Sequence, residues 1–150
     1  MSLAVGNDLK LYYNTGTDAS PTWSEICQTG DISVDLSCND AEVDLRCTNW
    51  LLNLPAKLSG GINLKLAFNP GNTVYDALRG MFFSRTVKQF AVANGAIATT
   101  GTEYFKAFAY FSSFNWSLAT QEMSSHDAKL SLAYEEESGS LVEPAWGTIS

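Results

Sequence analysis

Residues of the types that carry out catalysis are few in this chain of 150 residues, and they are scattered. His126 is the only histidine, and it lies in Ser125-His126-Asp127, which has the residue types of a nucleophile, a base and an orienting carboxylate. Neighbouring residues of a strand point to alternate faces, so these three side chains cannot contact one another in series. We expect a polar turn here, ahead of the last strand.

Cysteine chemistry and metal binding have little support. Cys27, Cys38 and Cys47 are odd in number and lack a Cys-x-x-Cys spacing, which argues against a disulfide framework and a zinc site. A catalytic cysteine needs a nearby base, and only His126 is of the usual type. We expect three free, partly buried thiols in a reducing cytoplasm, and no metal or cofactor.

Two carboxylate pairs, Asp40 with Glu42 and Glu135 with Glu137, have the residue types that hydrolyse glycosides. Their spacing does not place them across a cleft, and solvated loops explain them equally well. Gly60-Gly61 lacks the Lys and the Ser or Thr of a phosphate-binding loop. We therefore predict that the chain is not an enzyme.

Composition favours a protein that assembles with others. Hydrophobic residues make up 45% of the chain, enough for one core, while charged residues make up only 17%. A surface so poor in charge is often covered by a partner. The formal net charge is −7 and the basic residues are scattered singly, so tight nucleic-acid binding is not expected. We see no signal peptide and no apolar run long enough to span a membrane.

Alternation of apolar and polar residues predicts several strands. The segments that show it lie at residues 9–13, 32–36, 43–47, 62–68, 87–92, 104–118 and 128–134. In the segment 104–118, Phe108, Tyr110, Phe114, Trp116 and Leu118 share one register, with a bend or bulge expected at Ser112-Ser113. Gly60-Gly61 is expected to open the strand that ends at Phe68.

One segment has the period of a helix instead. Its apolar residues follow the spacing i, i+3, i+4, i+7 and i+8, which forms a single core-facing stripe: Val74, Ala77, Leu78, Met81 and Phe82. Thr73 with Asp76 three residues later is a variant capping box. A helix is therefore predicted over about 73–84.

Strands with one helix and no βαβ alternation predict a mainly β fold. We expect a β-sandwich or barrel with one flanking helix and a long hairpin loop at about 40–54. The β domain is expected to span 1–134. Residues 135–150 are expected to form an exposed C-terminal arm that a neighbouring molecule could order.

The order of these segments resembles a known family. Gly6-Asn7-Asp8-Leu9-Lys10-Leu11-Tyr12-Tyr13, Trp23-Ser24-Glu25-Ile26, Asp31 to Asp35, Glu42 to Trp50 and Leu54-Pro55 follow one another as in major tail-tube proteins of long-tailed, siphovirus-type bacteriophages. A strand like Gly61 to Phe68, one helix and returning strands come next. The resemblance covers most of residues 6–134.

This resemblance implies a structural subunit of the virion tail, made and assembled in the host cytoplasm. Its members form hexameric rings whose sheets join into a lumen wall, and the rings stack into the conduit for genome ejection. The implied partners are further copies of the chain and other tail proteins, such as the tape measure and the terminators. DNA passes through without specific binding, and no membrane is involved.

The hairpin loop is the predicted contact between rings. Trp50 and Leu51 would be its apolar anchors, and Asp44 and Arg46 its polar rim, because an apolar cluster lies within a polar connection. The alternative is that Trp50 and Leu51 fold back onto their own core. The strands at 62–68 and 104–118 are candidates for the lumen sheet, and the direction of Lys65 and Lys106 is left open.

Two other functions stay open. The first is the tube subunit of a related contractile injection system or gene-transfer particle. The second is a β-sandwich carbohydrate-binding module, in which tryptophans would form an aromatic platform for sugar: Trp23, Trp50, Trp116 and Trp146. Against the second stands Trp116, whose register in its strand is that of a buried residue.

Overall fold

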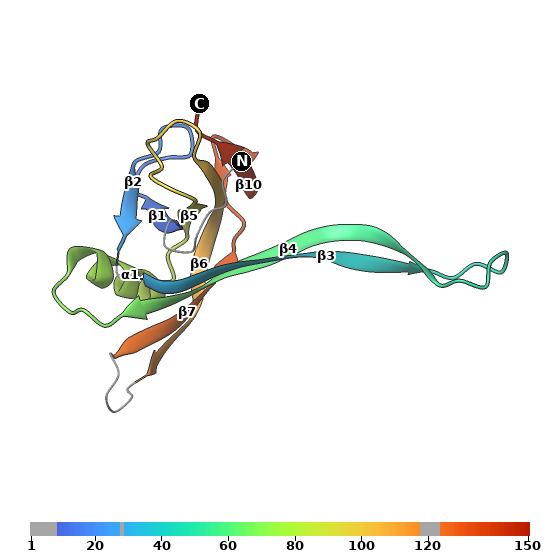
Figure 1. The fold of residues 1–150 in the computed structure, drawn as a ribbon, viewed down its shortest axis with the longest axis horizontal. Helices are drawn as coiled ribbons and strands as arrows, with labels where there is room; N and C mark the ends of the chain where they lie inside the picture. The colour runs from blue at the N-terminus through green and yellow to red at the C-terminus, as the bar shows by residue number, and fades with distance from the viewer. Residues whose placement is uncertain (1–8, 28, 118–123) are drawn as a thin grey trace.

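The structure, a computed structural model, describes residues 9–27, 29–117 and 124–150 (Figure 1). Its elements in chain order are β1 (Lys10–Asn14), β2 (Trp23–Ile26), β3 (Thr29–Val43), β4 (Leu52–Ala67), α1 (Thr73–Ser84), β5 (Lys88–Ala93), β6 (Glu103–Ser117), β7 (Ser125–Leu132), β8 (Glu136–Glu137), β9 (Ser140–Leu141) and β10 (Ala145–Thr148). The mainly β fold with a helix at 73–84 is confirmed. Within the described ranges, no helix is long and apolar enough to cross a membrane.

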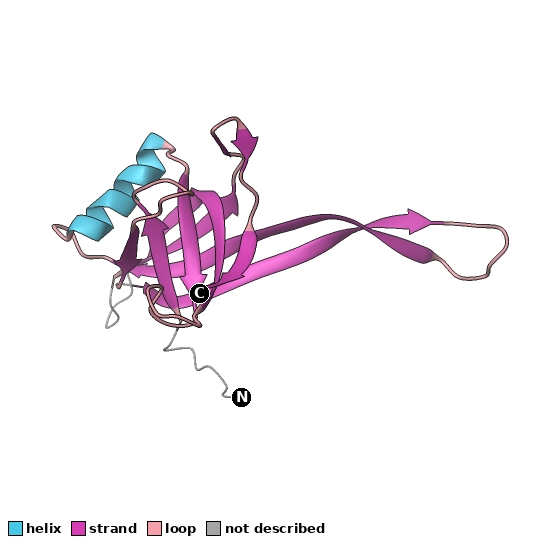
Figure 2. Ribbon diagram, turned by 90° about the horizontal axis from the view of Figure 1, so that it is seen from above, coloured by secondary structure: helices cyan, strands magenta, loops and turns pink. Residues whose placement is uncertain are grey.

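Most strands form one large antiparallel sheet in the order β2-β1-β5-β6-β7-β4-β3, and β10 pairs with the beginning of β6. Strands β8 and β9 pair separately with each other. Its two halves turn toward each other, and α1 lies against one side (Figure 2). The core between them takes Leu11 and Phe90 from one half, Ile62 and Leu130 from the other, and Leu78 from the helix, all of them fully or almost fully buried.

The pairing of β6 with β7 shifts register between Phe111 and Ser113, so the bulge expected at this place is confirmed. A bulge turns the following side chains to the other face of the strand. The single register predicted for 108–118 is therefore wrong. Phe114 and Trp116 pair with Ala128 and His126 and lie on the same face as the buried Phe111, whereas Tyr110 lies on the opposite face. Trp116, near the end of the strand, is 56% exposed. Leu118, the last residue of that register, lies outside the described residues.

Helix α1 begins one residue earlier than the predicted capping box requires. Its N-cap is Asn72, whose Oδ1 accepts hydrogen bonds from the backbone N–H groups of Val74 and Tyr75 at 3.1 Å each. Asn is preferred over Thr at the N-cap, which agrees with the use of Asn72 instead of Thr73. At the other end, Arg85 adopts the left-handed conformation that closes many helices.

A long hairpin, β3 with β4, extends away from the rest of the molecule (Figures 1 and 2). Its last pair is Val43 with Leu52, so the connection spans 44–51 and is shorter than the predicted 40–54. The strand predicted at 43–47 is therefore wrong beyond Val43. Apolar alternation indicates a strand with one buried face. The outer part of the hairpin has no buried face, so the pattern does not apply there.

Gly60-Gly61 lies inside β4 and does not open it. A Cβ atom on Gly60 would lie 2.6 Å from the carbonyl oxygen of Asp35 and 2.7 Å from the Leu36 side chain. The two strands therefore approach each other here more closely than any other residue would allow.

The C-terminal residues pack against the β domain of their own chain. Ala145–Thr148 pair with β6, and the backbone N–H of Ile149 donates to the carbonyl oxygen of Thr102 at 2.9 Å. Ile149 also packs beside a second, smaller apolar cluster: Tyr12, Ala91, Ala93 and Ile97. The division into residues 1–134 and 135–150 stays a prediction. Gly6-Asn7-Asp8, where the resemblance begins, lies outside the described residues.

Candidate functional site

The hairpin brings the four predicted contact residues together at its far end. Asp44, Arg46, Trp50 and Leu51 all lie in the connection 44–51, and all are exposed. Trp50 is 75% exposed and Leu51 59%. The alternative that these two fold back onto their own core is therefore wrong. Their role in ring stacking stays a prediction.

The structure adds apolar residues that alternation assigned to the inside or did not single out. Leu36 and Leu58 belong to the part of the hairpin that leaves the core, and Leu58 is 82% exposed. Leu45, Leu52 and Leu54 continue this exposed apolar surface toward the tip. Nothing local distinguishes Leu36 from the half-buried Val34 two residues before it. Only the point at which the hairpin leaves the domain decides its exposure.

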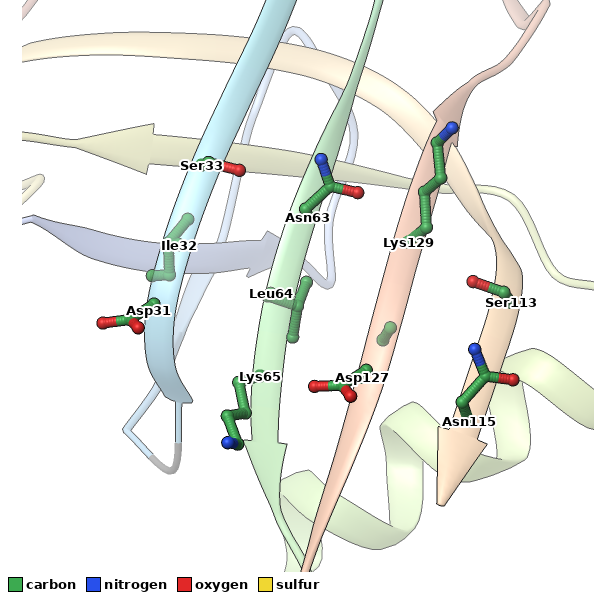
Figure 3. A pocket seen from close by; sticks show the side chains of 11 residues that line it. Asp31, Ile32, Ser33, Asn63, Leu64, Lys65, Ser113, Asn115, Asp127 and Lys129 are labelled. Carbon is green, nitrogen blue, oxygen red and sulfur yellow. The ribbon is translucent and has the colours of Figure 1, made fainter. Parts of the chain in front are cut away.

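One face of the strands β3, β4, β7 and β6 carries polar side chains, and Figure 3 shows two rows of them that cross it. The row at Ser33 continues through Asn63 and Lys129 to Ser113. The next row contains Lys65, Asp127 and Asn115, with Asp31 at its β3 end. These side chains line a shallow groove of about 560 Å³.

Charges on this polar face are mixed. Asp31, Asp35 and Asp127 face Lys65 and Lys129, and the side chain of Asn63 donates a hydrogen bond to Asp35. Opposite charges on neighbouring strands offset one another, so the face presents no cluster of positive charge to a phosphate backbone. It is a hydrophilic, nearly neutral wall.

Lys106, the other lysine of the predicted lumen strands, lies elsewhere. Its ammonium group is 3.1 Å from Oδ1 of Asp18, which also accepts a hydrogen bond from Gln89 at 2.7 Å. Gln89 in turn accepts a hydrogen bond from Asn14 at 2.8 Å, and both amides are buried. This network fixes the loop between β1 and β2. The Gln89 hydrogen bond, followed by Lys106, lowers the pKa of the Asp18 carboxyl.

The outer edge of β3 has no partner strand among the described residues. This strand of 15 residues pairs with β4 alone among the described strands. Free N–H and C=O groups along such an edge are the usual means by which another chain extends a sheet. The edge adjoins the polar face, because Asp31, Ser33 and Asp35 belong to the same strand.

His126 is part of the core and is not placed for catalysis. Its Nε2 lies 2.7 Å from the Tyr75 hydroxyl, and its ring lies 4.3 Å from that of Phe114 between centroids. Asp127 next to it is exposed on the polar face, as strand alternation requires. Burial lowers the pKa of His126, and the nearby Arg79 lowers it further. Tyr75, fully buried, was missed because it falls outside the predicted apolar stripe.

The other candidates for chemistry stand apart. Cys27, Cys38 and Cys47 are free and exposed, and the prediction of partial burial is wrong because two of them lie on the projecting hairpin. Both carboxylate oxygens of Glu137 accept a hydrogen bond from the backbone N–H of Asp18. Within the described ranges, no group of three or more His, Cys, Asp or Glu residues could hold a metal ion.

No protein-family model and no curated protein matches this chain by sequence. The fold does match solved structures. The SPP1 tail tube, determined by solid-state NMR and cryo-EM, superposes with a TM-score of 0.76 at 11% identity, over 99% of this chain and 81% of that one. The tail of an empty gene transfer agent particle, with C6 symmetry, gives 0.68 at 17% identity, over 95% and 100%.

A third match extends the comparison beyond tails. The sheath–tube complex of an extracellular contractile injection system, PVC, gives a TM-score of 0.62 at 14% identity, over 94% of this chain and 88% of that one. Identities this low establish a common fold and no more. The expected resemblance is confirmed at that level: the chain has the tail-tube fold.

Proposed function

We propose that the chain is the structural subunit of a phage tail tube, assembling into stacked, hexameric rings that form the conduit for genome ejection. One observation carries the proposal. Within the tail-tube fold, the described residues combine a polar sheet face, a strand edge beside it that pairs with no other described strand, and a projecting hairpin with an exposed apolar tip. The free edge and the exposed apolar tip are liabilities for a monomer, whereas a tube subunit uses all three features.

The polar face is the proposed lumen wall. Its reverse side is the apolar core, so only this side of β3, β4, β7 and β6 can face water in a closed ring. Paired charges such as Lys65 beside Asp127 attract phosphate weakly, and the chain as a whole is acidic. DNA would therefore slide past without specific binding.

The free edge of β3 is the proposed joint within a ring. Pairing with a strand of the next subunit would satisfy its backbone groups and continue the polar wall from copy to copy. A contact between two different surfaces closes into a ring when its rotation allows. The C6 symmetry of the similar gene transfer agent tail supports six copies.

The hairpin tip is the proposed contact between rings. Trp50 and Leu51 would be the anchors, since a large exposed aromatic beside an aliphatic residue is typical of interface centres. Asp44 and Arg46 would form the polar rim. Other tail proteins, such as the tape measure and the terminators, are further proposed partners in the virion tail, and no catalytic role is proposed.

The alternatives differ in their support. A tube subunit of a gene-transfer particle or contractile injection system would use the same surfaces, and structures of both kinds are similar to this chain. The carbohydrate-binding alternative is weaker, because the four tryptophans lie on separate elements: Trp23 on β2, Trp50 at the tip, Trp116 on β6 and Trp146 on β10. They do not make one platform.

Electron microscopy and light scattering of the purified chain test the proposal. We expect rings or hollow tubes at high protein concentration. The variant Trp50→Ser/Leu51→Ser should form single rings without stacking, while Phe83→Ser, equally exposed on α1 at 75%, serves as the matched control. A chain that stays monomeric and melts at a higher temperature with oligosaccharides would contradict the proposal. Unchanged tubes from the tip variant would exclude the stacking role alone.

A further inference from the structure

An apolar hollow lies where the hairpin leaves the domain. Two adjoining cavities of about 720 and 280 Å³ share Leu36 and Phe105 in their walls. Leu58, Leu132 and Trp146 are further apolar residues of the lining, and Leu58 and Trp146 are 82% and 65% exposed. We name these five residues the root groove. Large side chains left this exposed around a concave surface mark a site that another molecule covers.

We propose that the root groove of one subunit binds the hairpin tip of a second copy of the chain, through Leu45, Trp50 and Leu51. This inference rests on the proposed function and deepens it, because it names the surface that receives the tip. The tip is a convex apolar element and the groove a concave one, and among the described residues both are exposed. Each satisfies what the other lacks.

The length of the hairpin requires that the two surfaces belong to different copies. Val43, the last paired residue before the connection, lies seven residues after Leu36 in the groove. At roughly 3.3 Å a residue this ribbon is about 23 Å long before the tip itself is added. A paired ribbon does not bend back onto its own root. Its reach approaches the diameter of a small domain, about 30 Å, so it spans to the groove of an adjacent copy.

Charges at the margins agree with this pairing. Lys57 and Glu143 stand at the rim of the groove, one positive and one negative. At the tip, Asp44 and Arg46 also carry one negative and one positive charge. Asp44 could face Lys57 of the groove, and Arg46 could face Glu143. Two different surfaces that complement each other repeat from copy to copy, which is the geometry that builds rings and tubes. Rim charges add selectivity for the correct register more than they add affinity.

Two native cysteines allow a direct test. Cys38 lies in the wall of the larger cavity, and Cys47 lies in the connection 44–51; both are free and exposed. In a Cys27→Ser background, assembled protein treated with a short bismaleimide should yield cross-linked ladders. Mass spectrometry should map the link to Cys38 of one copy and Cys47 of the next.

Mixing variants makes the test specific. Neither Cys38→Ser nor Cys47→Ser should cross-link alone, whereas an equal mixture should give dimers only, joined Cys38 to Cys47. Leu58→Glu should lower the yield of this link at least about tenfold, the effect of about 1.4 kcal/mol in binding. Leu58 is exposed enough for the variant to fold, and Phe83→Glu is the control.

The outcomes separate this inference from the proposed function. Tubes that form without the Cys38–Cys47 link, or that link only Cys47 to Cys47, would overturn the groove as the receiving surface and leave the tube intact. Cross-linked ladders in a protein that never forms rings or tubes would support the groove and contradict the tube. A full yield of the link from Leu58→Glu would also overturn the inference.

Discussion

The imidazole ring of His126 is packed by aromatic rings and has one polar partner among the described residues. The Tyr75 hydroxyl forms a hydrogen bond with Nε2 of His126, while Nδ1 is buried and has no hydrogen-bond partner among the described residues. The rings of Phe68, Phe114 and Trp116 lie within 6.0 Å of it, centroid to centroid. Such a site favours the neutral imidazole, since a charge there would be both desolvated and close to Arg79.

Stability should therefore fall as the pH drops through the range of histidine. The pKa of His126 is lowered in the folded chain, so below about pH 6.5 the unfolded chain takes up the proton first. Protonation then favours unfolding until the folded-state pKa is passed, and above pH 7 the effect is absent. Urea denaturation at pH 5.5, 6.5 and 7.5 measures it.

The matched variant is Tyr75→Phe/His126→Phe, which removes both polar groups together and leaves neither unpaired. It should lose the slope between pH 5.5 and 6.5. Because His126 is the only histidine, no other side chain ordinarily titrates there. A slope that persists in the double variant would contradict this account.

Gln89 is the second residue whose loss should be severe. It connects Asn14 to Asp18, and its side chain is almost fully buried. Gln89→Ala leaves a buried amide donor of Asn14 without its acceptor, which should cost roughly 1–3 kcal/mol in the free energy of unfolding. Chemical denaturation measures this, with the exposed Asn115→Ala as control. A loss no larger than that of the control would show that the network carries little stability.

At the scale of elements, the helix was predictable and its cap was not. The stripe of Val74, Leu78 and Met81 is a local periodicity, and Leu78 and Met81 are buried. Asn72 and Thr73 both suit a cap, and only the backbone geometry selects between them. The bulge in β6 followed from Ser112-Ser113, yet the faces on which Tyr110 and Trp116 lie needed the register with β7. That register is a long-range pairing, which no short window of the sequence contains.

For the candidate site, sequence located the tip and missed the groove. Trp50-Leu51 stands out as an apolar pair in a polar connection. The root groove joins Leu36, Phe105 and Trp146 from three distant strands, and no spacing along the chain connects them. The length of the paired strands in the hairpin was underestimated, because the outer parts of β3 and β4 have no buried face that apolar alternation could indicate.

Helix α1 offers a paired test of its cap. Asn72→Ala removes the acceptor of two backbone N–H groups and should destabilise the chain by about 0.5–2 kcal/mol. Asn69→Ala, three residues before it and exposed, is the control. Thermal or urea unfolding measures both. Equal stability of the two variants would indicate that the cap is not at Asn72.

At the scale of the whole molecule, the two faces of the large sheet differ in what they contact. The inner side binds α1 and closes the core, while the outer side of β3, β4, β7 and β6 carries the mixed charges of the proposed lumen. Assembly would turn that outer side into the only surface that DNA meets. The same residues would then govern passage although they contribute little to folding.

Asp31→Lys/Asp127→Lys tests this division, because both carboxylates are exposed and the changes give the polar face four lysines. Assembled tubes of this variant should retain double-stranded DNA at low salt and release it as salt rises, since each neutralised phosphate steepens the dependence of binding on salt. Wild-type tubes should retain little. A filter-binding titration across salt concentrations measures both. The control is the same variant as a monomer, which carries the same added charge without an enclosed channel. Strong DNA retention by the monomer would show that the added charge alone explains the binding. Weak retention by the tubes would contradict the assignment of the polar face to the lumen.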